Sequence, residues 1–159
     1  MRWTFVDSPI GVFSVATDGD SVCGTRFGQV EEATAEPVDE VARQAVAELR
    51  AYFAGELTEF GVPVRVPRGS EFERAVWREM TRIPYGEMLT YGEVARRVGD
   101  PGAARAVGVA CNRNPIPVIV PCHRIIGAGG KLVGFGGGLP RKIKLLELEA
   151  RVTLSHTWS

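Results

Sequence analysis

The chain has 159 residues, of which 45% are hydrophobic and 24% charged, a balance typical of a globular protein with one domain or two small ones. No run approaches the roughly 20 apolar residues that cross a membrane, and the start "MRWTFVDSPIG" lacks the pattern of a signal peptide. We therefore expect a cytoplasmic protein with reduced thiols. Its three cysteines form no CxxC pair, so no disulfide framework, zinc site or other metal centre is predicted.

The formal net charge is zero, but the two halves of the chain differ in charge. Residues 1–64 carry 4 basic and 11 acidic side chains, a balance of −7, and residues 65–159 carry 15 basic and 8 acidic ones, a balance of +7. Between 94 and 144, nine Lys or Arg residues accompany a single acid, Asp100. Two interpretations stay open: an ordinary solvated face, or a phosphate-facing surface on the C-terminal half.

The first half has the pattern of a small α/β domain, which we place with its linker at residues 1–66. Apolar and polar residues alternate in "RWTFVD" and "GVFSVAT" around the turn "SPIG", which predicts a hairpin, and "SVCGTRFG" predicts a third strand. From Val38 to Ala54 apolar residues recur at helical spacing, and Gly55 ends the pattern. The proline- and glycine-containing segment "FGVPVRVPRGS" predicts the linker.

The second half, residues 67–159, is predicted to be mainly helical. Ser70 fits the N-cap of a first helix and Thr90 that of a short second one, "YGEVARRVG". Asp100 at the N-cap and Pro101 at the first position predict a third helix, and the pair joined by "VGDPG" has helix-turn-helix proportions. The glycine-rich "RIIGAGGKLVGFGGG" predicts a hairpin or loop, a candidate wing, before a closing helix "LPRKIKLLELEA". We expect an α/β N-terminal domain with a small antiparallel sheet and a winged helix-turn-helix-like C-terminal domain.

Cys122 and His123 stand side by side behind Pro121. A free thiol is only a few per cent ionised at neutral pH, so a reactive cysteine needs an activating base. His123 is the realistic base, because the other histidine, His156, lies in the C-terminal tail. Neighbouring residues of a strand point to opposite faces, so the pair requires a turn, which Pro121 favours, or a bridging water. A buried structural cysteine beside a chance histidine is the alternative.

Three further side chains are candidates, each with an ordinary alternative. Arg105 is the only long side chain in "PGAARAVGVA", so it is either a solvated arginine or the projecting residue of a smooth helix that enters a DNA groove. Asn114 before Pro115 is ordinarily a turn residue. Glu149 on the last predicted helix is either a solvated carboxylate or the group that orients a histidine in a nucleophile–base–carboxylate relay.

The segment "NPIPVIVPCHRIIG", followed by "GKLVGFGGGLPRKIKLLELE", resembles the signature of the methylated-DNA–protein-cysteine methyltransferases, the O6-alkylguanine-DNA alkyltransferases. The similarity covers roughly residues 70–150 and includes "IPYGEMLTYGEVARRVGDPGAARAVG"; "DSPIG" and "YFAGELTEF" resemble the family's N-terminal domain more weakly. The resemblance implies a DNA repair protein that flips O6-alkylguanine, foremost O6-methylguanine, out of duplex DNA and transfers the alkyl group irreversibly to its own cysteine. Weaker action on O4-alkylthymine is a further expectation.

The resemblance also implies a role for each matching catalytic residue. Cys122 is the alkyl acceptor, and His123 is the base that takes the thiol proton through a water. Glu149 is the carboxylate that holds the histidine. Asn114 is the hinge asparagine between the recognition helix and the active-site loop.

For DNA binding, the resemblance implies that Tyr91 rotates the target phosphate and that Arg105 fills the stack vacated by the guanine. The recognition helix enters the minor groove, where the small residues Ala104 and Gly108 permit close approach. We also expect Arg113 to contact DNA.

The expected substrate pocket includes Ile125, Phe135 and Gly136. The family usually has tyrosine where this chain has Phe135, and that hydroxyl is implied to hydrogen-bond the departing guanine. The loss of one such donor costs on the order of 10- to 1000-fold in rate, unless water or a backbone N–H replaces it.

Two other function classes are the alternatives. A DNA-binding module without chemistry would need none of Cys122, His123 and Glu149, and a cysteine hydrolase would need an oxyanion site that the sequence does not indicate. We expect no metal and no cofactor, double-stranded DNA with O6-alkylguanine as the partner, no membrane and no obligate protein partner. A monomer is expected, with clustering on DNA left open.

Overall fold

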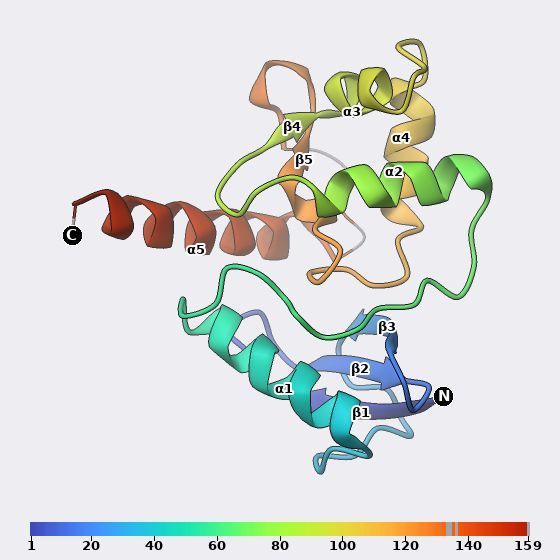
Figure 1. The fold of residues 1–159 in the computed structure, drawn as a ribbon. Coiled ribbons are helices and arrows are strands. Elements are labelled where there is room, and N and C mark those ends of the chain that lie inside the picture. Colours follow the sequence, from blue (N-terminus) through green and yellow to red (C-terminus); the bar gives the residue numbers. More distant parts are fainter. Residues whose placement is uncertain (133–134, 136, 159) are drawn as a thin grey trace. The chain divides into compact units, whose positions relative to one another are not determined.

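The computed structural model describes residues 1–132, 135 and 137–158 and divides into two compact units, Met1–Arg68 and Gly69–Ser159 (Figure 1). The expected class is confirmed: a small antiparallel sheet in the first unit and a mainly helical second unit. No helix within the described part of the chain is long and apolar enough to cross a bilayer.

The first unit is a three-stranded antiparallel sheet with one helix packed across it (Figure 1). The strands follow one another in space in chain order, so the predicted hairpin is confirmed, and the predicted third strand pairs antiparallel with β2. The elements are β1 (Arg2–Val6), β2 (Phe13–Thr17), β3 (Val22–Phe27) and α1 (Glu40–Phe53).

The central strand β2 is buried along its whole length, although its sequence alternates apolar and polar residues. Helix α1 packs on one face of the sheet, and an apolar cluster formed by Trp3, Ala16 and Cys23 lies on the opposite face, so β2 is covered on both. Ser14, on the same face as Ala16, is buried without cost because its hydroxyl oxygen accepts the N–H of Val30 at 3.1 Å.

The segment predicted as a linker is partly bound to the sheet. Pro63 accepts a hydrogen bond from the N–H of Val22 at 2.8 Å, and the N–H of Arg65 donates back to Val22 at 2.9 Å. The Arg65 guanidinium also pairs with Asp18 at 2.6 Å. Prolines favour extended backbone, which suits pairing with an edge strand such as β3, so residues 63–65 belong to the first unit.

The second unit begins at its predicted caps. Ser70 and Thr90 are the N-caps of α2 and α3, as predicted, and each forms a capping box. Trp77 ties α2 to α4 by donating its indole N–H to the carbonyl of Ala110 at 2.9 Å. The elements are α2 (Glu71–Thr81), β4 (Leu89–Thr90), α3 (Tyr91–Arg97), α4 (Ala104–Asn112), the 3-10 turn η1 (Cys122–Arg124), β5 (Ile125–Ile126), the turn η2 (Ala128–Gly130) and α5 (Leu139–Trp158).

The start of α4 differs from the prediction. Asp100 and Pro101 were expected at the N-cap and first position, but the helix begins at Ala104. The N–H of Ala103 donates to the carbonyl of Asp100 at 3.0 Å and closes a turn around Pro101 and Gly102. Proline followed by glycine is strong β-turn chemistry, and this turn takes the residues that the sequence pattern assigned to the helix.

The glycine-rich segment after Cys122 contains no hairpin among its described residues. Its strand β5 pairs in parallel with β4, with Ile125 opposite Leu89, and the short turn η2 follows. Residues 133, 134 and 136 of the candidate wing lie outside the described residues. The closing helix α5 continues beyond the predicted segment, so that the expected tail, including the exposed His156, is helical.

Candidate functional site

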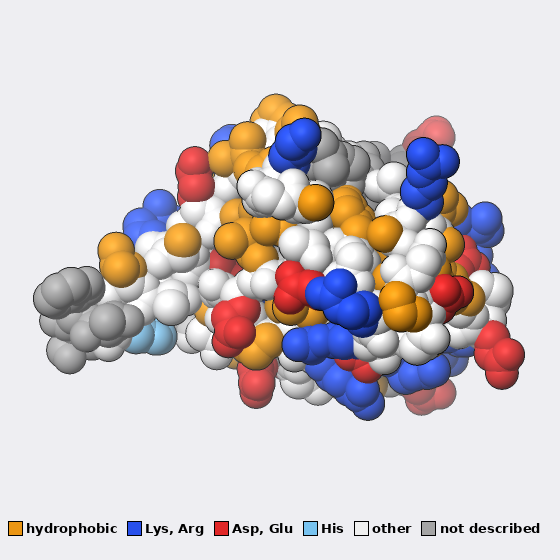
Figure 2. Space-filling model, turned by 90° about the horizontal axis from the view of Figure 1, so that it is seen from above, with side chains coloured by type: hydrophobic (Ala, Val, Ile, Leu, Met, Phe, Trp, Pro, Cys, Tyr) orange, Lys and Arg blue, Asp and Glu red, His pale blue; other side chains and the backbone are white. Residues whose placement is uncertain are grey.

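A cavity of about 550 Å³ lies between α3 and α4, a volume usual for ligand sites. Figure 2, seen from the side on which α3 and α4 lie, shows Lys and Arg side chains interspersed with Asp and Glu side chains and with hydrophobic and uncharged surface. The described lining residues come from both helices and η2: Thr90, Tyr91, Gly92, Arg96, Ala104, Arg105, Gly108 and Ala128.

The cavity brings together four of the five residues expected to bind DNA, namely Tyr91, Ala104, Arg105 and Gly108. Burial raises the pKa of Tyr91 to about 12, so its hydroxyl stays protonated and can donate a hydrogen bond at neutral pH. A Cβ at Gly108 would meet the Tyr91 ring at 3.8 Å, an ordinary contact, so α4 lies directly against that ring.

The remaining DNA and pocket candidates lie elsewhere. Arg113 ends α4 and pairs with Glu73 at 2.9 Å. The side chain of Ile125 is fully buried in β5, and Phe135 is half-buried. Gly136 lies outside the described residues.

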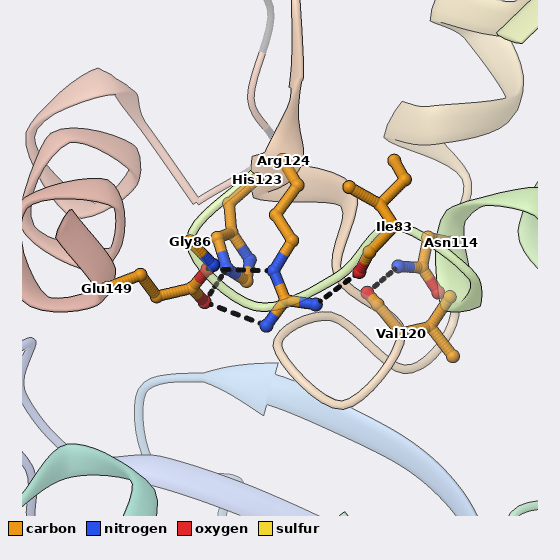
Figure 3. Close-up of polar contacts among 7 residues, drawn as sticks. All are labelled: Ile83, Gly86, Asn114, Val120, His123, Arg124 and Glu149. Atoms are coloured by element: carbon orange, nitrogen blue, oxygen red, sulfur yellow. Dashed lines mark hydrogen bonds and ion pairs between the residues drawn. The ribbon is translucent and has the colours of Figure 1, made fainter. Parts of the chain in front are cut away.

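A second site lies where η1, α5 and the loop after α2 meet, with its side chains pointing toward one another (Figure 3). His123 Nε2 lies 2.7 Å from Glu149 Oε2, and the two side chains are 0% and 1% exposed. Glu149 is therefore not a solvated carboxylate. The predicted histidine–carboxylate pair meets across 26 residues of sequence.

Arg124 and the loop after α2 hold the carboxylate of Glu149 in place. Arg124 donates from Nε to Oε1 at 2.8 Å and from a terminal nitrogen to Oε2 at 3.0 Å, and its other terminal nitrogen donates to the carbonyl of Ile83 at 2.8 Å. The N–H of Gly86 donates to Oε1 at 3.1 Å. The two hydrogen bonds from Arg124 to the Glu149 carboxylate fix the plane of that carboxylate. Neither Arg124 nor Gly86 was predicted from the sequence, although the arginine lies in the segment "VPCHR", directly after Cys122 and His123.

The charge state of the pair follows from its surroundings. Burial raises the pKa of Glu149, but the hydrogen bonds and charges of His123 and Arg124 outweigh burial and hold that pKa well below its usual range. Burial lowers the pKa of His123, against the opposing effect of Glu149. At neutral pH an ionised carboxylate therefore accepts the Nε2–H of a neutral imidazole, which leaves Nδ1 as the nitrogen that takes up a proton.

Cys122 is the first residue of η1 and is 7% exposed. Burial raises its pKa to about 11, although a hydrogen bond from Asn114 and the charge of Lys142 lower it. The resting thiol is protonated, so reaction requires a base. The other cysteines are no easier to ionise: burial raises the pKa of Cys111 to about 12 and also raises that of Cys23.

Asn114 braces the loop between α4 and Cys122. Its Nδ2 donates to the carbonyl of Val120 at 2.9 Å, and its Oδ1 accepts the N–H of Ile116 at 2.9 Å. The same Val120 carbonyl accepts the N–H of Cys122 at 2.9 Å. Within this loop Val118 has φ +75°, a left-handed conformation that is rare for a β-branched residue. The braced loop thus fixes where the thiol lies.

Lys142 is a fully buried lysine that was not predicted to be a site residue. Its Nζ donates to the carbonyl of Ile125 at 2.6 Å and lies 6.0 Å from the ring centroid of Phe135. Burial lowers the pKa of Lys142, and its charge lowers that of Cys122. Lys142 and Glu149 are two helical turns apart on α5, so they share a face of the helix. This spacing is the sequence pattern from which the burial of Lys142 could have been predicted.

Replacing Gly86 with alanine is expected to destabilise the second unit and to displace Glu149. Gly86 has φ +81°, and a Cβ there would overlap Oγ1 of Thr153 on α5. The left-handed conformation alone costs an alanine about 1–2 kcal/mol, and the overlap adds about 1–3 kcal/mol. Thermal melting measures the loss.

Gly99→Ala is the matched control for this prediction. Gly99 has φ +87°, and no atom from outside its immediate chain neighbourhood lies within 4 Å of its ideal Cβ, so its replacement carries the conformational cost alone. Equal melting temperatures for the two variants would contradict the assigned contact with Thr153.

No group of three His, Cys, Asp or Glu side chains in residues 1–132, 135 and 137–158 is arranged to hold a metal ion.

Comparison with protein families matches both units. Residues 71–151 match the DNA-binding domain of 6-O-methylguanine DNA methyltransferase, and residues 1–66 match its ribonuclease-like domain.

Individual relatives match over nearly the whole chain. The methylated-DNA–protein-cysteine methyltransferase of Mycolicibacterium paratuberculosis is 53% identical over 155 residues, which cover 95% of this chain and 93% of that protein. The protein of the same name from Methanosarcina acetivorans is 46% identical and covers 94% of this chain and 98% of its own length. The crystal structure of Mycobacterium tuberculosis OGT in complex with DNA is 47% identical, with a TM-score of 0.87 over 96% of this chain and 94% of that one.

Proposed function

This chain belongs to the 6-O-methylguanine DNA methyltransferase family, and from that premise we propose that Cys122 receives the alkyl group. Its activity is DNA repair by transfer of an alkyl group from methylated DNA to a cysteine of the protein. The observation that carries the assignment of Cys122 is that the next residue, His123, forms a buried pair with Glu149, with 2.7 Å between His123 Nε2 and Glu149 Oε2.

The proposed step is a displacement at the alkyl carbon bound to O6 of guanine. Cys122 Sγ attacks that carbon, so a sulfur–carbon bond forms as the carbon–oxygen bond breaks and its electron pair stays with the guanine. The thiol proton passes through a water to His123 Nδ1, and ionised Glu149 stabilises the imidazolium. The departing guanine anion takes up a proton from solvent, and the His123 imidazolium later releases its proton to solvent. The thioether product is stable, so each molecule acts once.

We propose that α4 enters the minor groove of double-stranded DNA and that the cavity beside it receives the flipped nucleotide. An alkylated O6 cannot be reached inside a duplex, and extrusion of the base costs a few kcal/mol. Exposed Arg105 fills the gap in the stack, Tyr91 rotates the target phosphate, and the small side chains of Ala104 and Gly108 allow close approach. The +7 balance of residues 65–159 supports binding to phosphates without sequence preference.

We further propose that the chain works as a monomer, without a cofactor or an obligate protein partner. A nucleophilic cysteine must be reduced, and Cys122 is a free thiol. This requirement supports a cytoplasmic location, where thiols are kept reduced.

The proton path predicts how transfer depends on pH. His123 accepts a proton only when neutral, and burial lowers its pKa from the ordinary 6.5. The single-turnover rate is therefore expected to be constant between about pH 7 and 8 and to fall only as acid protonates the imidazole. A rate that instead rises about tenfold per pH unit toward the thiol pKa of about 11 would contradict the relay and favour direct ionisation.

Phe135→Tyr is expected to speed transfer while it changes DNA affinity little. Negative charge spreads into the purine as the carbon–oxygen bond breaks, and a positioned hydroxyl stabilises that charge in the transition state, by about 10-fold or more in rate. An unpaired buried hydroxyl costs about 1–3 kcal/mol, so melting of the variant is measured with the kinetics. An unchanged rate together with an unchanged melting temperature would show that another group already stabilises the guanine.

Mass spectrometry after incubation with duplex DNA that contains O6-methylguanine tests the proposed function. The protein is expected to gain the mass of one methyl group, which peptide mapping places on Cys122, and unmodified DNA is the control. A DNA-binding module would gain no mass, and a cysteine hydrolase would turn over without a lasting adduct. The same assay with O4-methylthymine measures the weaker activity that we propose.

A further inference from the structure

The cavity between α3 and α4 is lined in part by Arg96, an arginine to which neither the proposed transfer step nor the proposed DNA contacts assign a role. Arg96 on α3 and Arg105 on α4 are the charged residues among its described lining, and both are exposed. Neither guanidinium forms a hydrogen bond or ion pair with any residue that the structure describes. Because arginine stays ionised in proteins, two positive charges face this cavity.

Nearby acidic charge does not neutralise Arg96. The acid next to it on α3 is Glu93, one turn earlier, whose pKa the hydrogen bonds of Thr90 lower most, with smaller effects from Arg96 and Arg97. The Glu93 carboxylate accepts the N–H of Thr90 at 3.0 Å and so caps the helix. Among the described residues Glu93 and Arg96 form no ion pair, and the Arg96 charge has only a minor effect on the pKa of the Glu93 carboxyl.

The remaining lining is suited to a phosphate-bearing ligand. Tyr91 lies five residues before Arg96, about 7.5 Å along the axis of α3, and its hydroxyl is protonated at neutral pH. Between the charged residues the wall is built from Gly92, Ala104 and Gly108, which leave room for a group to approach the backbone.

We propose that Arg96 binds the phosphate of the extruded nucleotide, an inference that rests on the proposed function. A guanidinium binds a phosphate through two parallel hydrogen bonds. The phosphate that Tyr91 rotates toward the cavity meets Arg96 only when the nucleotide is extruded. A contact made in one of two states shifts the equilibrium toward that state. Arg96 is thus a positioning residue: it holds the flipped state while Arg105 fills the stack.

Arg97 is the matched control. It follows Arg96 in the last turn of α3, is also exposed, and has the same acid one turn earlier. It is not among the described residues that line the cavity. Arg96→Ala and Arg97→Ala therefore remove the same charge from the same helix end, and only the first removes it from the cavity.

The experiment compares single-turnover methyl transfer from duplex DNA containing O6-methylguanine with transfer from the free O6-methylguanine base. Arg96→Ala is expected to slow duplex transfer about 10-fold or more relative to Arg97→Ala, the effect of one charge-assisted hydrogen bond. The free-base rates should agree within about twofold, because a free base needs no extrusion and both positions are exposed. Arg96→Lys should restore part of the duplex rate, since lysine keeps the charge but not the bidentate geometry.

Three other outcomes are distinguishable: two would refute the proposed role of Arg96, and one would refute the proposed function. Equal duplex rates for Arg96→Ala and Arg97→Ala would make Arg96 an ordinary solvated arginine, while the proposed function stands as long as the wild type gains its methyl group. Equal losses on duplex and free base would make its role structural. A wild type that gains no methyl group would refute the proposed function itself.

Discussion

Cys122→Ser is expected to abolish alkyl transfer and to leave DNA affinity nearly unchanged. A serine hydroxyl keeps the shape of the thiol but is a far weaker nucleophile. The site is 7% exposed, whereas the arginines of α3 and α4 that face the cavity are exposed, so phosphate contacts should survive. Intact mass after incubation with methylated duplex measures transfer, and a fluorescence titration with unmodified duplex measures binding.

The other cysteines supply the controls for this variant. Cys111→Ser and Cys23→Ser remove buried thiols whose pKa values burial raises, and both should retain transfer. A methyl group mapped to Cys23 or Cys111 in the Cys122→Ser protein would contradict the assignment of the acceptor.

Glu149→Gln is expected to reduce transfer on the order of 100-fold or more, because the imidazolium that forms on His123 loses its counter-charge. The same change leaves the Arg124 guanidinium, 8% exposed, without its carboxylate. Breaking a buried ion pair on one side costs about 3–5 kcal/mol, so the melting temperature should also fall. Kinetics are measured at a temperature where the variant is folded, which separates the two effects.

Glu147→Gln, an exposed change on the same helix, is the control and should alter neither the rate nor the melting temperature. The pH dependence gives a second check. The pKa of Glu149 is lowered in the fold, so its stabilisation is complete above the ordinary value of 4.5 and is lost as pH falls below it. The difference in melting temperature between wild type and Glu149→Gln should therefore be constant near neutral pH and become smaller in acid. A gap that is independent of pH would point to packing instead.

Local sequence signals predicted the elements that depend on neighbouring residues. The N-caps at Ser70 and Thr90 and the first hairpin are of this kind. Asp100 failed as a marker because an aspartate before proline suits both an N-cap and a β-turn, and Gly102 decides for the turn. The burial of β2 on both faces and the pairing of residues 63–65 with β3 involve distant segments, which periodicity does not report.

The same distinction applies to the candidate site. Adjacency marked Cys122 and His123, but the partner of the histidine lies 26 residues away, and the family resemblance was needed to single out Glu149. The N–H of Gly86 reaches that carboxylate across 63 residues, and no local pattern in the sequence indicates such a contact. Arg96 was read only as part of a basic run, because its place in the cavity depends on how α3 and α4 pack together.

The left-handed backbone at Val118 limits how far this protein can be improved by engineering. Glycine there would relieve about 1–2 kcal/mol of conformational strain. Val118 is only 1% exposed, however, and giving up a buried valine side chain costs about 1.5–3 kcal/mol. These two free-energy terms nearly cancel. Glycine would also raise the conformational entropy of the unfolded chain, which lowers the stability of the fold. A strained residue that looks like an obvious target for stabilisation is therefore already close to the best compromise for one position. A gain there requires changing the hydrogen-bonded loop around Asn114 as a whole.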